Sequence, residues 1–200
     1  LKNEAFLCEC SEFDDIIAFK EDGTYLVTKV DDKKFLGKKI IYAGLWKKND
    51  RHMIYNVVYL SKKDGKSYIK RFSIESILKD KEYPISKNIE DAKILYITGN
   101  PNSESEIIKV NLHFKSKAKK KEFEYNFNDI MIKNRLSKGN ILTKYPIRKI
   151  IQSELGSSTF GGKKVWFDES IGKFNFDERG VLLGRFEVDD KVLVVYKTGE

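Results

Sequence analysis

The sequence predicts an all-β fold made of repeated, propeller-like units of about four strands. The apolar residues are largely Ile, Val, Phe and Tyr, which favour strands over helices. Short apolar segments also recur at a regular spacing, with turn residues between them. Hydrophobic residues make up 40% of the 200 positions and aromatic residues 12%, so the chain can bury a substantial core.

Two segments have the pattern of a tight β-hairpin. Residues 16–19 lead through Asp22-Gly23 into residues 25–30, and residues 55–60 lead through Asp64-Gly65 into residues 68–72. Asp-Gly supplies the positive φ angle at which a two-stranded ribbon reverses. Both segments are therefore expected to form antiparallel strand pairs.

Two later segments repeat this pattern. Residues 94–98 lead into 106–110 through a turn at Pro101, and residues 130–133 lead into 141–145 through a turn at Gly139. Counted from Ile16 to Val57, Leu95 and Met131, the repeat period is 41, 38 and then 36 residues, close to that of propeller blades. The chain thus predicts about four blades with a fifth begun, near residues 14–53, 54–92, 93–129, 130–187 and 188–200. Helical periodicity is weak, and only residues 147–154 are compatible with a short helix.

The positive charge is concentrated in the middle of the chain. Residues 1–60 carry 10 basic and 10 acidic side chains, residues 61–150 carry 21 and 11, and residues 151–200 carry 7 and 9. The net charge of +8 thus arises in the middle segment, which favours a basic surface facing a partner. The alternative is a lysine-rich chain with solvated faces.

No pattern in the sequence predicts an active site, a metal site or a cofactor. Gly161-Gly162 precedes two lysines, but no Ser or Thr follows where a phosphate-binding loop would place its magnesium ligand. His52 and His113 are far apart, and Cys8 with Cys10 forms no recognisable metal motif. No apolar run approaches the roughly 20 residues of a membrane span.

Four segments of the chain have a recognisable sequence. They cover residues 14–48, 54–74, 135–150 and 161–175, and they read DDIIAFKEDGTYLVTKVDDKKFLGKKIIYAGLWKK, IYNVVYLSKKDGKSYIKRFSI, RLSKGNILTKYPIRKI and GGKKVWFDESIGKFN. These segments resemble the C-terminal domain of the A subunit of bacterial topoisomerase IV and DNA gyrase. The segments occur in the same order as in that family, and the resemblance extends over essentially the whole chain.

The resemblance implies a β-pinwheel, a propeller-like ring whose blades exchange strands and whose basic outer rim bends duplex DNA without reading its sequence. It implies a non-catalytic fragment of a longer A subunit, which forms a dimer, acts in the bacterial cytoplasm on the nucleoid and works with a separate ATPase B subunit. The fragment itself would need no cofactor and would contact no membrane. The sequence starts at Leu1 rather than Met, which also suggests part of a longer chain.

The gyrase branch of this family carries a box reading Gln-Arg-Arg-Gly-Gly-Lys-Gly. The nearest match here, residues 158–164, keeps only Gly161, Gly162 and Lys163 at its centre. This departure favours a topoisomerase IV role, in relaxation and decatenation, over gyrase-like wrapping.

The expected DNA-binding residues are the basic side chains that follow the hairpins or lie in the last turn and the degenerate box. The aromatic residues Trp46, Trp166, Tyr68 and Phe72 are expected in the core rather than stacked on bases. For the lysine run 115–121, DNA contact and simple solvation remain equally open. Two other functions stay possible, a protein-interaction β-propeller that binds an acidic partner and an RNA-binding β-barrel array. The expected DNA contacts are Lys29, Lys70, Arg71, Lys109, Lys138, Lys144, Arg148, Lys163 and Lys164.

Overall fold

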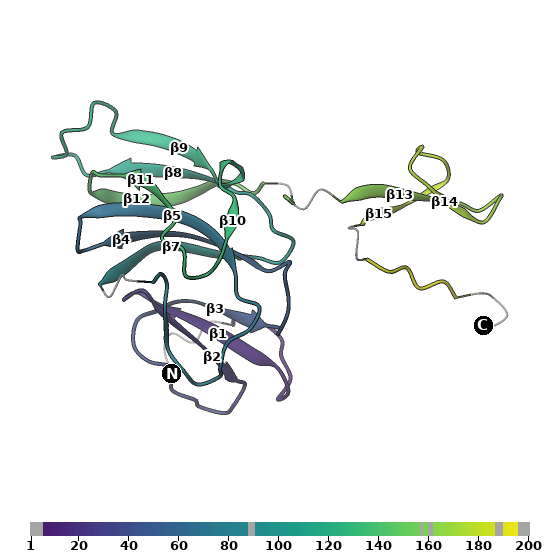
Figure 1. Cartoon of the computed structure of the whole chain (residues 1–200), viewed down its shortest axis with the longest axis horizontal. Helices are drawn as coiled ribbons and strands as arrows, with labels where there is room; N and C mark the ends of the chain where they lie inside the picture. The colour runs from purple at the N-terminus through teal and green to yellow at the C-terminus, as the bar shows by residue number, and fades with distance from the viewer. Residues whose placement is uncertain (1–5, 88–90, 157, 160–161, 187–189, 196–200) are drawn as a thin grey trace. The chain divides into compact units, whose positions relative to one another are not determined.

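A computed structural model of the whole chain confirms the all-β prediction (Figure 1). It describes residues 6–87, 91–156, 158–159, 162–186 and 190–195, which fall into two compact units, 1–159 and 160–200. Within these described residues the helical structure is one 3-10 turn, Phe127–Asp129, and no helix is long and apolar enough to cross a bilayer.

The first sheet of unit 1 has the strand order β3-β1-β2-β6. The first predicted hairpin is confirmed, because β1 and β2 pair antiparallel with Ile17 opposite Val27. Gly23 makes the reversal possible: its φ is +84°, and an added Cβ would lie 2.6 Å from the Cβ of Ala92. The strands are β1 (Asp15–Lys20), β2 (Thr24–Lys29), β3 (Ile40–Trp46) and β6 (Tyr83–Pro84).

The second sheet is the middle layer of unit 1, with the order β10-β5-β4-β7 and β11 also paired to β5. The second predicted hairpin is confirmed here, since Val58 of β4 lies opposite Ile69 of β5. The strands are β4 (Ile54–Ser61), β5 (Lys66–Ser73), β7 (Ala92–Asn100), β10 (Ile132–Lys133) and β11 (Asn140–Thr143).

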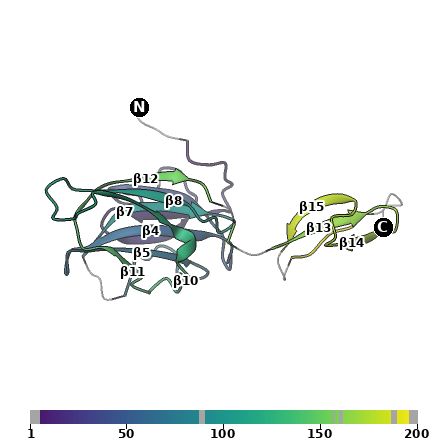
Figure 2. The ribbon, with the colours of Figure 1, turned by 90° about the horizontal axis from the view of Figure 1, so that it is seen from above.

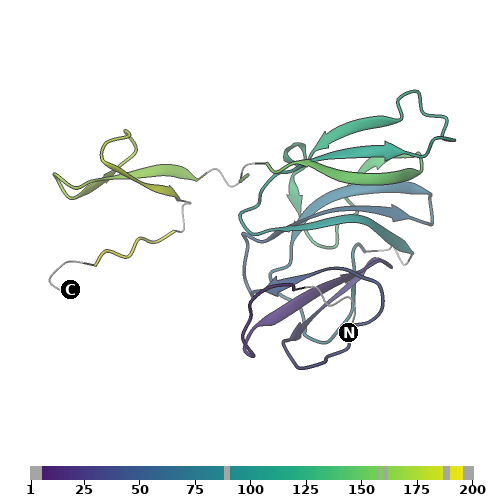
Figure 3. The same ribbon diagram turned by 180° about the vertical axis from the view of Figure 1, so that it is seen from behind.

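Both faces of this second sheet are covered. Tyr55 and Val57 pack in one core cluster with residues of the first sheet, whereas Val58 packs in a second cluster with the third sheet. Successive strand residues point to opposite faces, so a strand buried on both sides is apolar almost throughout rather than alternating. Figures 1 and 3 show the three sheets as successive layers from opposite sides.

The third sheet has the order β12-β8-β9. Its strand β12 corrects the prediction of a short helix at 147–154, because these residues pair antiparallel with β8 along the sheet edge. Figure 2 shows β8 and β12 from above. The strands are β8 (Ile107–Leu112), β9 (Glu122–Asn126) and β12 (Ile147–Glu154).

The third and fourth predicted hairpins are wrong. Strand β7 pairs with β4 of the second sheet, while β8 pairs with β9 and β12 of the third, so the turn at Pro101 is a crossing between sheets. Strands β10 and β11 lie one after the other along β5 and do not pair with each other. In both cases the segment pairs with the edge of another strand, whose backbone groups would otherwise stay unpaired, rather than with its neighbour in sequence. Later segments thereby complete earlier sheets, which is the strand exchange that the resemblance implies.

The second unit is one three-stranded sheet with the order β14-β13-β15. Residues 190–195 form no strand, and the remaining residues of the expected fifth blade lie outside the described part of the chain, so that blade stays a prediction. The strands are β13 (Lys163–Asp168), β14 (Lys173–Asn175) and β15 (Val181–Phe186).

A buried carboxylate joins the second and third sheets. Glu106, which has no exposed surface, accepts hydrogen bonds from Asn56 Nδ2 at 3.0 Å and Tyr96 OH at 2.7 Å. It also accepts from Gln152 Nε2 at 2.8 Å and from the Thr98 hydroxyl. Both of its oxygens are thus satisfied by donors from three strands, β4, β7 and β12, which offsets the cost of burying the charge.

A buried arginine completes this polar network. The Nε atom of Arg71 donates to Asn56 Oδ1 at 3.0 Å, so Asn56 links the buried cation to the buried anion. The guanidinium also donates to the carbonyl oxygen of Ser103 at 2.9 Å and to Thr159 Oγ1 at 3.1 Å. Arg71 therefore bonds the second sheet both to the loop between β7 and β8, which we call the crossing loop, and to Thr159 at the end of unit 1.

We expect Arg71→Met to lower the free energy of unfolding of unit 1 by about 3 kcal/mol, because removing one partner of a buried charged network leaves the others unsatisfied. Urea denaturation can be followed by Trp46 fluorescence in a Trp166→Phe background, since the chain has only these two tryptophans. The exposed Lys29→Met is the control and should change stability by less than about 0.5 kcal/mol. An equally small effect of Arg71→Met would show that the network does not stabilise the fold.

Candidate nucleic-acid interface

Lys70 was expected on a DNA-binding rim, and the structure corrects this. Its side chain is fully buried, and Nζ donates to the carbonyl oxygens of Arg135 at 2.7 Å, of Ser137 at 3.1 Å and of Ile85. Nζ also lies 4.2 Å from the ring centroid of Phe72. The sequence contains a signal for this burial, because a strand period of two places Lys70 on the same face as two aromatic residues of β5.

Arg71 is likewise not a surface residue. It is 2% exposed, and its donors are directed to Asn56, Ser103, Glu104 and Thr159 inside unit 1. Charge reversal at Lys70 and Arg71 would therefore disrupt the fold rather than test DNA binding. Lys70 and Arg71 thus stabilise the interior of unit 1 through hydrogen bonds to other segments of the chain.

Lys109 and Lys138 reach the surface but are each paired with an acidic side chain. Lys109 Nζ lies 2.6 Å from Glu122, and the pKa of this lysine is raised by that contact. Lys138 Nζ lies 3.2 Å from Asp64 and 4.4 Å from the centroid of Tyr68. Their charges are largely neutralised in place, which makes both weaker candidates for a polyanion.

The other expected contacts are distributed over both units. Lys29 is exposed at the end of β2, opposite Asp15, and Lys164 is exposed in the second unit with Nζ 5.9 Å from the Trp166 ring. In the degenerate box Gly162 is described, whereas Gly161 and the side chain of Lys163 lie outside the described residues.

Lys144 and Arg148 are exposed, and the structure brings them together with the lysine run. The β8–β9 loop is closed by a hydrogen bond from Leu112 N to Lys121 O at 2.8 Å. The next residue, His113, donates its backbone N–H to Pro146 O at 2.8 Å, which joins this loop to the turn between β11 and β12. We name the resulting surface the basic end, and its exposed cations are Lys115, Lys117, Lys119, Lys120, Lys144, Arg148 and Lys149.

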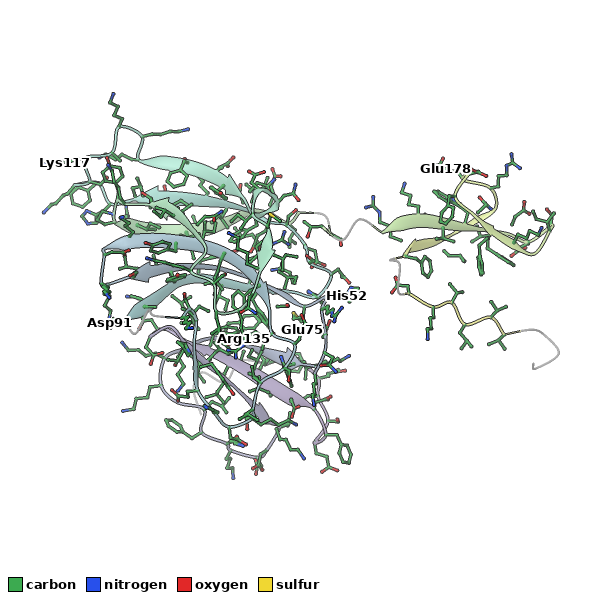
Figure 4. All side chains as sticks on the ribbon, in the orientation of Figure 1. His52, Glu75, Asp91, Lys117, Arg135 and Glu178 are labelled. Atoms are coloured by element: carbon green, nitrogen blue, oxygen red, sulfur yellow. The ribbon has the colours of Figure 1, made fainter. Side chains whose placement is uncertain are left out.

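The two segments that form the basic end contain no acidic residue. Residues 107–121 contain six lysines and no acidic residue, and residues 130–153 contain six basic residues and no acidic one. Among the described residues none of its cations forms an ion pair, in contrast to Lys34, Lys62 and Lys79 elsewhere, which each contact an aspartate. Figure 4 shows Lys117 at the outer end of the loop, where long side chains extend away from the sheets. Such a surface attracts anions over a distance of about 8–10 Å at physiological salt.

The aromatic prediction is confirmed for three of the four residues. Trp46, Tyr68 and Phe72 are buried in the first core cluster, while Trp166 is half-buried in the second unit. Sequence reasoning missed Lys149 and left the loop lysines open. The signal that could have found them is the complete lack of acidic residues over two separate segments, which the fold then brings side by side.

Comparison with known proteins gives three matches. The family model described as "Topoisomerase C-terminal domain, Bacteroidota" matches residues 2–154. The A subunit of DNA topoisomerase 4 from Borreliella burgdorferi is 32% identical over 79 residues, which are 39% of this chain and 12% of that protein. The crystal structure of the C-terminal domain of DNA topoisomerase IV superposes with a TM-score of 0.43 at 12% identity, over 72% of this chain and 47% of that one.

We expect the stability of unit 1 to rise as the pH increases from about 7 to about 9.5, because burial lowers the pKa of Lys70 to about 7. An unfolded lysine titrates near pH ~10.4, so in this window the unfolded state binds more protons than the folded state. The rise is at most about 1.4 kcal/mol per pH unit. Above this window, the raised pKa values of buried Tyr55 and Tyr59 and of half-buried Tyr96 act in the opposite direction.

Urea denaturation at several pH values, compared between the parent and Lys70→Met, isolates this contribution. The variant is less stable at neutral pH, because three carbonyl oxygens lose their donor, but its stability should not rise over the window. Equal slopes in the two proteins would refute a pKa near neutrality for Lys70.

Proposed function

The chain belongs to the family of topoisomerase C-terminal domains of Bacteroidota, and from this premise we propose that it is the non-catalytic DNA-binding and DNA-bending domain of a topoisomerase IV-like A subunit. The observation that carries the proposal is the basic end, where exposed cations from two segments lie together and, among the described residues, form no ion pair with an acidic side chain. The domain would hold the transported duplex for an ATP-dependent change in topology.

The chemistry of the basic end suits the phosphate backbone of a duplex. Each cation that contacts a phosphate releases condensed counterions, and this contribution to affinity is independent of sequence. Lysine-rich loops place point charges that adapt to phosphate positions, whereas base-specific readout would require rigidly held donors in a groove. The basic end offers several such charges within one continuous surface, so we expect binding without sequence preference.

The rest of the reaction would lie in other parts of the protein. The chain spans 12% of the curated relative that it matches, so cleavage, religation and dimerisation are proposed for regions outside it, and ATP hydrolysis for a B subunit. We propose that no cofactor is bound by this domain and that it acts in the bacterial cytoplasm on the nucleoid.

A measurement of affinity for a linear duplex of random sequence across a salt series tests the proposal. The parent should show a log–log slope of several units, since each neutralised phosphate contributes about −0.9. The triple variant Lys144→Gln, Arg148→Gln, Lys149→Gln should reduce the magnitude of that slope by about 2.7. All three side chains are exposed, so the fold should be retained.

The matched control is Lys34→Gln, Lys62→Gln, Lys79→Gln, which removes the same charge from lysines that are already paired with aspartates. This control should keep the parental slope. Equal losses in both triple variants would show that only net charge matters and that the basic end is not the site. Binding to poly-glutamate as tight as to DNA would instead favour a protein-interaction module with an acidic partner, and a preference for duplex RNA would favour the RNA-binding alternative.

A further inference from the structure

The basic end carries one exposed aromatic side chain that neither the core nor phosphate binding explains. Phe114, the second residue of the β8–β9 loop, is 67% exposed. Its ring stacks on His113, with centroids 4.5 Å apart and an interplanar angle of 27°, and Lys115 Nζ lies 5.6 Å from its centroid. A phenyl ring cannot bond to a phosphate, so in contact with a polyanion its favourable surfaces are bases and sugars.

The loop holds this ring in a defined position. Ser116 N donates to His113 O at 2.9 Å, which closes a turn with Phe114 as its second residue. Lys115 N donates to His113 Nδ1 at 3.3 Å, and Lys121 Nζ donates to the carbonyl oxygen of Ser116. His113 itself is bonded to Pro146, so the base of the turn is anchored to the neighbouring β11–β12 turn. An exposed ring on a braced turn loses little conformational entropy on binding.

The charges around the ring are arranged to bring a duplex onto it. Lys115, Lys117, Lys119 and Lys120 follow Phe114 along the loop, and Lys144 lies in the turn to which the loop is bonded. Phosphates held by these cations would leave a neighbouring base step facing the ring. Apolar side chains placed in this way unstack base steps and kink the duplex.

We propose that Phe114 is an intercalating wedge that inserts against a base step and produces the DNA bend, an inference that rests on the proposed DNA-binding function. The lysines of the basic end supply the affinity, and Phe114 converts that affinity into curvature. Bending then depends on one apolar side chain, while the salt dependence of binding depends on the cations. The two properties are separable by mutation.

Two duplex probes test the proposal in the full chain. A duplex labelled at both ends for energy transfer reports bending, and a duplex with 2-aminopurine at successive steps reports unstacking. With the parent, end-to-end transfer and 2-aminopurine fluorescence should both increase on binding. Phe114→Ala should lose both increases and bind about tenfold more weakly, as expected for one lost base–aromatic contact, with an unchanged salt slope. Phe114→Trp should restore both signals.

The control is Phe35→Ala, which removes a phenyl ring that is 77% exposed and is also flanked by lysines. Those neighbours, Lys33 and Lys34, are paired with Asp32 and Asp80, so this ring should not meet DNA and its removal should change nothing. If Phe114→Ala binds, bends and unstacks DNA as the parent does, the wedge is refuted while the proposed function stands. If the parent shows no salt-dependent binding, the proposed function fails, and the wedge fails with it.

Discussion

The link from Arg71 through Asn56 to Glu106 is the interaction on which unit 1 depends. Burying both a cation and an anion costs a large desolvation free energy. The folded state can compensate for this cost only if every donor and acceptor of the two groups has a hydrogen-bond partner. The Asn56 amide meets this condition in both directions, since its oxygen accepts from Arg71 and its nitrogen donates to Glu106. Because the partners come from β4, β5, β7 and β12, any shift of the third sheet against the second would leave a buried charge without partners.

The basic residues of the middle segment do not all serve the same role. Lys70 and Arg71 are interior, and their donors are used by carbonyl oxygens and by the polar network. The lysines of the β8–β9 loop and the cations after Thr143 are exposed and unpaired among the described residues, so they remain available to a ligand. The positive charge of the segment thus serves stability at one place and partner binding at another. Net charge alone does not distinguish the two uses.

The same network explains part of the degenerate box. Thr159 donates its backbone N–H to Ser103 O at 3.0 Å, and Ser158 Oγ donates to Asn102 O at 2.6 Å. Just before them, an added Cβ at Gly156 would lie 1.1 Å from the carbonyl oxygen of Ser105, so this position accepts only glycine. Where the gyrase box begins with Gln and Arg, this chain has small hydroxyl residues that fasten the end of unit 1 to its crossing loop. The departure from the box therefore has a structural role here.

The sequence by itself determined the all-β class, the two Asp-Gly hairpins and the family resemblance, because strand propensity, turn chemistry and motif order are local properties. It also located the positive charge, although not which cations are exposed. Tertiary structure decided that β7 and β8 belong to different sheets, since strand pairing depends on which free edge is near rather than on sequence distance. It decided that Lys70 and Arg71 are buried, because their acceptors come from residues that are between 15 and 88 positions away in the sequence. It also joined two acid-free segments into one surface through the bond between His113 and Pro146, a contact that no spacing in the sequence encodes.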